Sequence, residues 1–172
     1  MENKFEPHFL VVDDEPDIRE LLEESLREKY KNVHIAEDGE IALNILNTKH
    51  IDIIISDYNM PNMNGFELYK QTREQGYEIP FIFLTAYSSK LGKEYSGQID
   101  YLILHKPYKA EHLLKVANAA CQMSESIHQL EAKTIKFCQQ GNPSVKDLMK
   151  FKQKHRALIY LKKERLLSCS ND

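Results

Sequence analysis

The sequence has few cysteines and no long apolar segment. Its 172 residues include three cysteines, Cys121, Cys138 and Cys169, which follow no disulfide or zinc-binding spacing, so reduced thiols are expected, as in cytosolic proteins. No run of 18 or more apolar residues occurs, which excludes a membrane-spanning helix. Residues 1–7 also lack the apolar segment of a secretory signal peptide. These absences predict a cytoplasmic protein without a membrane span.

Several motifs of metal and nucleotide chemistry are missing as well. The seven histidines are scattered without metal-ligand spacing, so each is expected to be a surface or packing residue rather than a ligand. After residue 120 there is no zinc-ligand pattern, glycine-rich phosphate loop or catalytic triad. An enzyme with its own small-molecule substrate is therefore not expected.

Short apolar runs alternate with helical segments along the first two thirds of the chain. The predicted strands lie near 8–13, 32–36, 51–57, 79–85 and 100–106, and the predicted helices near 16–30, 39–48, 64–75 and 88–96. The strand runs are nearly continuous rather than alternating, which is typical of a parallel sheet covered by helices on both faces. Gly92 and Gly97 weaken the fourth helix. The pattern predicts an α/β fold with a doubly wound parallel sheet.

Polar side chains stand at the C-terminal ends of four predicted strands. In chain order they are Asp13 and Asp14, Asp57, Thr85 and Lys106. Open α/β sheets bind their ligands at this edge. Three carboxylates, a hydroxyl and an ammonium group together suit a hard cation and a phosphoryl group.

These sites, in their order and spacing, resemble the receiver domain of two-component response regulators. The matching pieces cover about the first 120 residues and are Asp13-Asp14, Asp57 with Met60-Pro61 and Gly65, Thr85-Ala86, and Lys106-Pro107. The resemblance implies a flavodoxin-like, five-stranded parallel sheet in the order 2-1-3-4-5. It also divides the chain into a receiver domain over 1–122 and a helical extension over 123–172.

The resemblance implies a specific chemistry at the strand ends. Asp57 would be the nucleophile that accepts a phosphoryl group from a phosphohistidine of a sensor histidine kinase or phosphotransfer protein. Mg²⁺ would have two direct carboxylate ligands, Asp14 and Asp57. Asp13 would bind the ion through water, and Asn59 through its backbone carbonyl. Without the ion, the clustered carboxylates are expected to raise the pKa of at least one of them.

Three further residues would contact the phosphoryl group by the same resemblance. The Lys106 ammonium would neutralise its charge, and Thr85, followed by Ala86, would hydrogen-bond to it and move toward it. Taken alone, the lysine could equally be a solvated strand-end residue and the threonine a β-favouring surface residue. The complete set of strand-end residues favours the phosphoryl site.

One position departs from the family. The family carries an aromatic ring three residues before the lysine, which swings inward when the threonine moves, whereas this chain has Ile103 there. Tyr101 lies on the same face of the strand, two residues earlier, and Tyr87 follows Thr85 by two residues. These two tyrosines are the candidate switch aromatics.

Apolar residues recur at alternating three- and four-residue spacing from residue 113 onward. They are Leu113, Val116, Ala120, Met123, Ile127, Leu130, Thr134 and Phe137. This pattern predicts a long helix with a coiled-coil seam that runs two to three turns beyond a family fifth helix. No sheet is expected to cover the last apolar members, Met123, Ile127, Leu130 and Phe137. They are predicted to pack on a final helix in a hairpin, on a second chain in a homodimer, or on both.

The charge of the chain changes sign near residue 130. Residues 1–130 hold 13 lysines and arginines against 22 acids, whereas residues 131–172 hold 10 against 4. A basic final helix is predicted over 143–167, after the break at 141–143.

Three alternative functions follow from these patterns. The first is phosphorylation-dependent signalling through a downstream protein or a dimer; the others are nucleic-acid binding by the basic helix and a phosphorylation-independent assembly module.

Overall fold

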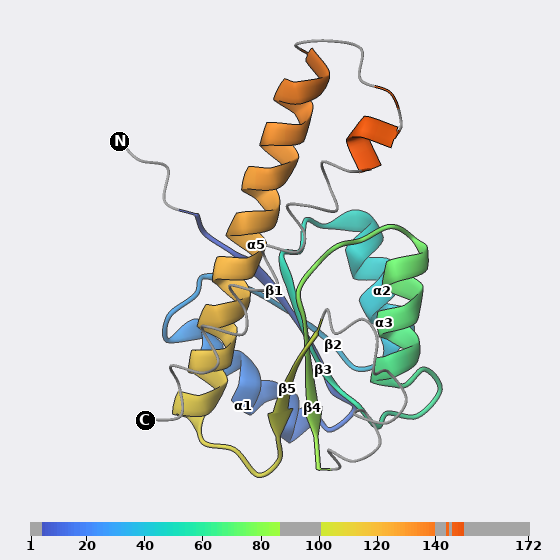
Figure 1. Ribbon diagram of the computed structural model, residues 1–172. Helices are drawn as coiled ribbons and strands as arrows, with labels where there is room; N and C mark the ends of the chain where they lie inside the picture. The colour runs from blue at the N-terminus through green and yellow to red at the C-terminus, as the bar shows by residue number, and fades with distance from the viewer. Residues whose placement is uncertain (1–4, 87–100, 140–143, 145, 150–172) are drawn as a thin grey trace.

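The computed structural model describes residues 5–86, 101–139, 144 and 146–149. Its elements, labelled in Figure 1, are β1 (His8–Val12), α1 (Pro16–Arg27), β2 (Asn32–Ala36), α2 (Gly39–Thr48), β3 (Ile53–Asp57), α3 (Gly65–Glu74), β4 (Phe81–Thr85), β5 (Tyr101–His105) and α5 (Ala110–Gln139). The predicted helix over 88–96 and most of the predicted helix over 143–167 lie outside the described residues.

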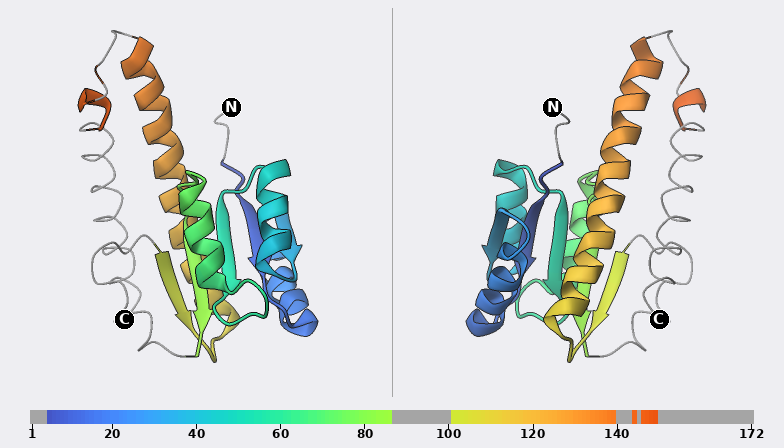
Figure 2. Two further views of the ribbon diagram at one scale, coloured as in Figure 1. Left: turned by 90° about the vertical axis from the view of Figure 1, so that its right-hand side faces the viewer. Right: turned by 90° about the vertical axis from the view of Figure 1, so that its left-hand side faces the viewer.

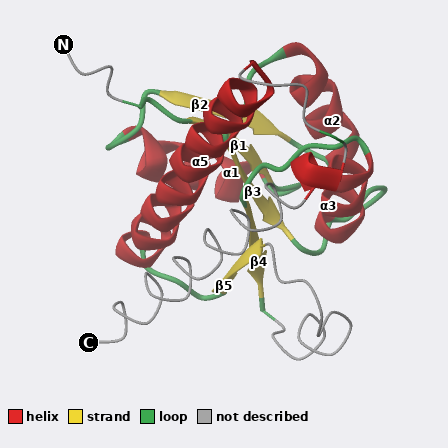
Figure 3. Ribbon diagram, turned by 45° about the horizontal axis from the view of Figure 1, so that its top comes forward, coloured by secondary structure: helices red, strands yellow, loops and turns green. Residues whose placement is uncertain are grey.

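The five strands form one parallel sheet in the order β2-β1-β3-β4-β5, as predicted. Helices α1 and α5 cover one face, and α2 and α3 cover the other (Figures 2 and 3). The fold is therefore the doubly wound, flavodoxin-like fold. Since all strands run the same way, their C-terminal ends meet at one edge of the sheet.

Both faces of the central strands are buried, which accounts for their continuous apolar sequence. On β1, Phe9 and Val11 belong to the core cluster under α1 and α5, whereas Leu10 and Val12 belong to the cluster under α2 and α3. All four side chains are fully buried. Burial of each such side chain contributes about 1.5–3 kcal/mol to folding before entropic costs are counted.

Local sequence signals start the helices at the expected places. Pro16 occupies the first turn of α1. A backbone N–H there would have no acceptor within the helix, so its absence in proline costs no hydrogen bond. At α3, the Asn64 side chain accepts hydrogen bonds from the backbone of Phe66 and Glu67, and the Glu67 carboxylate accepts one from the Asn64 backbone. This capping box fixes the turn that joins β3 to α3.

Helix α5 continues well beyond the sheet. Its 30 residues span about 45 Å, and its C-terminal half passes the N-terminal ends of the strands (Figure 1). Met123, Ile127 and Leu130 contribute to the core cluster of α1, α5 and the sheet. This cluster includes residues of the strands, so the expectation that no sheet covers these three residues is wrong. Phe137, further along the helix, is half-buried.

No helix in the described ranges has the length and hydropathy needed to cross a membrane.

Candidate functional site

The strand register brings the predicted acidic and basic residues to the same edge of the sheet. Asp13 directly follows β1, Asp57 is the last residue of β3, and Lys106 directly follows β5. Thr85 ends β4, and its carbonyl accepts a hydrogen bond of 2.8 Å from the Lys106 backbone N–H. Four segments that are distant in sequence thus contribute to one small area.

An ion-pair cluster is the centre of this site. The Lys106 Nζ atom lies 2.6 Å from Asp57 Oδ1 and 3.5 Å from Asp13 Oδ2. The Asp13 side chain is only 1% exposed and that of Asp57 is 10% exposed. One ammonium group therefore faces two carboxylates in a poorly solvated place, where charge interactions are stronger than in water.

Backbone N–H groups hold the two carboxylates in place. The Glu15 N–H donates to Asp13 Oδ1 at 3.0 Å, and the Asn59 N–H donates to Asp57 Oδ2 at 2.9 Å. Asp13 Oδ2 is buried, and among the described residues no donor forms a hydrogen bond with it. The Lys106 Nζ atom lies 3.5 Å from it, which is long for a charge-assisted hydrogen bond. This oxygen can therefore accept a cation.

The pKa values of the site follow from burial and from the ion pairs. Burial raises the pKa of the Asp13 carboxyl, and the negative charges of Asp57 and Asp14 add to the rise, against the opposing effects of the Glu15 N–H and of Lys106. The rise expected from the clustered carboxylates thus occurs, but burial is its largest cause. Burial also acts to lower the pKa of Lys106, yet the hydrogen bond and charge of Asp57 raise it overall. Lys106 is therefore held in its charged form.

These residues suit a magnesium ion. Asp13 Oδ2 is a buried oxygen without a hydrogen-bond donor, next to the Asp57 carboxylate, and Mg²⁺ prefers a small number of carboxylate ligands together with water. The Asp14 side chain is exposed beside this pair and can reach a hydrated ion from solvent. The roles of Asp14 as a direct ligand and of the Asn59 carbonyl remain predictions.

Gly65 and Ser56 contact the C-terminal end of β3, and only the glycine was singled out from the sequence. A Cβ atom at Gly65 would collide with the backbone carbonyl oxygen of Asp57 and would lie 2.8 Å from the Ser56 hydroxyl oxygen. That hydroxyl donates a hydrogen bond of 2.8 Å to the same Asp57 carbonyl. The start of α3 can therefore approach the end of β3 only because residue 65 has no side chain.

Tyr108 is a neighbour of the site that sequence reasoning missed. Burial raises the pKa of its phenol, and Asp13 and Asp57 raise it further, whereas Lys106 opposes the rise. The ring is half-buried and packs against the core cluster of α1, α5 and the sheet. Its position two residues after the strand-end lysine was the available signal.

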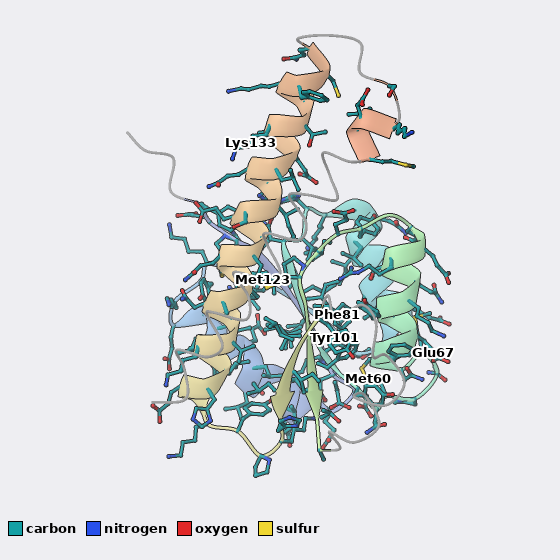
Figure 4. The ribbon with its side chains drawn as sticks, viewed as in Figure 1. Met60, Glu67, Phe81, Tyr101, Met123 and Lys133 are labelled. Atoms are coloured by element: carbon teal, nitrogen blue, oxygen red, sulfur yellow. The ribbon has the colours of Figure 1, made fainter. Side chains whose placement is uncertain are left out.

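The candidate switch residues differ in where they lie. Thr85 is at the same edge of the sheet as Lys106, whereas Tyr101 is at the other end of β5. Thr85 is buried, and Ala86 next to it is exposed. Tyr101 pairs with Phe81 at the start of β5, away from Lys106, and its ring is 5.1 Å from that of Phe83 (Figure 4). Tyr87 lies outside the described residues. A switch role for Tyr101 stays a prediction, and its present position is in the core.

Known proteins are similar to this chain in sequence and in fold. The response regulator receiver domain family matches residues 9–118. The chain is 32% identical over 126 residues to the response regulator SaeR of Staphylococcus aureus, covering 71% of this chain and 54% of SaeR. It is 48% identical over 77 residues to the sensor histidine kinase RcsC of Escherichia coli, covering 45% of this chain and 8% of RcsC.

Solved structures agree with this match. The chemotaxis response regulator CheY4 of Vibrio cholerae superposes with a TM-score of 0.59 at 34% identity, covering 67% of this chain and 99% of that one. The chain thus spans about half the length of SaeR and a small part of RcsC. The matched region contains all the strand ends described above, and the chain belongs to the response regulator receiver domain family.

Proposed function

We propose that this receiver accepts a phosphoryl group on Asp57 from a phosphohistidine of a partner protein, in the presence of Mg²⁺. The proposal is carried by one observation, the Lys106 ammonium 2.6 Å from Asp57 Oδ1 beside the buried carboxylate of Asp13. Such a cluster has both the nucleophile and the charges needed for phosphoryl transfer.

The reaction is a displacement at phosphorus. A carboxylate oxygen of Asp57 forms the new O–P bond while the N–P bond to the donor imidazole breaks, and the bonding electron pair returns to that nitrogen. The Asn59 N–H orients the carboxylate, and Lys106 offsets the negative charge of the transferred group. Mg²⁺, held by Asp13, Asp14, Asp57 and the Asn59 carbonyl, would supply further charge neutralisation. Thr85 would hydrogen-bond to a phosphoryl oxygen in the product.

The partner and the output follow from the same proposal. A sensor histidine kinase or phosphotransfer protein would supply the phosphoryl group, and the similarity to part of a sensor histidine kinase supports this class of partner. The chain would act as a phosphoacceptor rather than as an enzyme with its own substrate. Output would pass to a downstream protein or a second copy through the extension, for which 123–172 remains the proposed range.

Intact-mass measurement after incubation with acetyl phosphate and Mg²⁺ tests the proposal. We expect the wild-type chain to gain one phosphoryl group, Asp57→Asn to gain none, and EDTA to prevent labelling. Asp17→Asn is a matched control, since Asp17 is an exposed aspartate in the first turn of α1. Equal labelling of the Asp57→Asn variant, or full labelling in EDTA, would contradict the assignment.

A further inference from the structure

A second polar cluster lies at the opposite edge of the sheet from Asp57. Asp52 immediately precedes β3, His50 follows α2, and His128 is on α5. The Asp52 side chain is 1% exposed, and its Oδ1 atom lies 3.0 Å from Nε2 of His50 and 3.2 Å from Nε2 of His128. Two imidazole nitrogens that are distant in sequence therefore converge on one buried carboxylate oxygen.

The spacing of these three atoms fits the ligands of a metal ion. Around a tetrahedral Zn²⁺ ion with bonds of about 2.0–2.1 Å, ligand atoms are about 3.3 Å apart. The two nitrogen-to-oxygen distances are close to this value, and all three ligand atoms lie within 4.8 Å of one another.

The carboxylate is already oriented for this role. Asp52 Oδ2 accepts a hydrogen bond of 2.8 Å from the backbone N–H of His8, which leaves Oδ1 directed at the two histidines. Such a contact behind a ligand fixes its geometry and strengthens metal binding. The His50 ring also contacts the His8 ring, with centroids 5.7 Å apart.

A cavity gives the ion access to solvent and room for water. Its volume is about 220 Å³, and its lining includes His50, Asp52, His128, Ser124 and Glu131. His50 is 65% exposed and His128 is 37% exposed. Three protein ligands with an accessible fourth position for water are typical of open zinc sites rather than of closed structural ones.

We propose that His50, Asp52 and His128 bind a divalent transition-metal ion of the zinc class, and that this ion fastens α5 to the sheet. Two imidazoles and one carboxylate favour such an ion over Mg²⁺, which prefers oxygen ligands. The site is therefore separate from the magnesium site at the other edge in both position and chemistry. His128 lies in the part of α5 beyond residue 122, so the ion would tie the extension to the receiver.

Titration of the metal-free full-length protein with Zn²⁺ and Co²⁺ tests the site. With the Asp57 site filled by Mg²⁺ in large excess, we expect one equivalent to bind, with the visible spectrum of tetrahedral Co²⁺. His50→Gln and His128→Gln, which retain a hydrogen-bonding side chain, should each weaken binding at least tenfold. His112→Gln is the matched control because His112 is an exposed histidine on the same helix.

Hydrogen exchange tests the consequence for α5. Zn²⁺ should slow amide exchange around residues 123–130 in the wild-type chain and in His112→Gln, but not in His128→Gln. Absence of binding in the wild-type chain, or full affinity in a His50→Gln/His128→Gln double variant that melts like the wild type, would overturn the proposal. In the first case the three side chains form only a hydrogen-bonded cluster; in the second the ion binds elsewhere.

Discussion

Gly65 shows how one missing side chain shapes the candidate site around Asp57. The first turn of α3 lies directly on the Asp57 carbonyl, so an added methyl group forces either α3 or the end of β3 to move. Either movement changes the position of the Asp57 carboxylate relative to Lys106. At Gly76, in contrast, a Cβ atom would meet nothing within 4 Å, although φ is +84° there.

Gly65→Ala is expected to lower both stability and phosphorylation. Overpacking of this kind costs about 1–3 kcal/mol of unfolding free energy, and a displaced carboxylate should slow labelling by acetyl phosphate at least tenfold. Gly76→Ala should cost a similar free energy through backbone strain alone but should label at the wild-type rate. Urea unfolding and mass-based labelling measure the two effects. Unchanged labelling in folded Gly65→Ala would show that the close approach has no role in the site.

Cys121 and Cys138 are expected to differ strongly in reactivity. Burial raises the pKa of the Cys121 thiol to about 11, although the neighbouring Tyr30 hydroxyl and the Lys29 ammonium act in the opposite direction. The thiolate is the reactive form, so only about one thousandth of Cys121 is ionised at pH 8, and this fraction rises as the pH approaches the pKa. Cys138 is exposed.

Alkylation of the folded protein by iodoacetamide at pH 8, followed by peptide mass spectrometry, checks this difference. Cys138 should react within the experiment, whereas Cys121 should react only slowly, faster at higher pH, and at once in denaturant. Comparable rates for the two thiols in the folded protein would mean that the packing of Cys121 against the core cluster opens readily.

At the scale of elements, the part of α5 beyond residue 122 packs against the receiver core and does not only extend away from it. Its buried side chains continue through Met123 and Leu130, and Leu130 is only 9% exposed. Lys133, one turn further, is exposed, and Figure 4 shows where it and Met123 lie along the helix. The receiver core therefore extends past the proposed boundary at residue 122.

Leu130→Ala is expected to lower the free energy of unfolding by about 2–4 kcal/mol, because it removes buried methyl groups and leaves a cavity. Lys133→Ala should change it by less than about 0.5 kcal/mol, as exposed substitutions usually do. Chemical denaturation of the full chain measures both. If the two variants were equally stable, the C-terminal half of α5 would contribute nothing to the receiver core.

For the whole molecule, the sequence predicted the sheet, and the meeting of the strand-end residues at one edge, because both depend on local patterns. Continuous apolar runs predicted buried parallel strands, and parallel strands share an edge, so Asp13, Asp57 and Lys106 had to meet there. Other contacts depend on packing between distant segments. The three- and four-residue spacing predicted the length of α5. The meeting of His50 with His128, and the burial of Leu130, depend instead on which part of the receiver the C-terminal half of α5 packs against, which no local spacing reveals.

The predicted homodimer is best tested at a seam residue that lies outside the core of its own chain. Because Ile127 and Leu130 contribute to the core of their own chain, charges at these two positions would unfold the receiver as well as disrupt an interface. Phe137 continues the seam beyond them and is half-buried, so Phe137→Asp alters the seam without changing a residue of the core cluster.

We expect the wild-type chain to sediment as a dimer at tens of micromolar, and Phe137→Asp to be monomeric yet still phosphorylated at Asp57. Gln139→Asp, an exposed neighbour, is the control for added charge. A wild-type chain that sediments as a monomer with and without phosphodonor would instead favour packing of the seam within one chain, and the extension would then signal to a different protein rather than to a second copy.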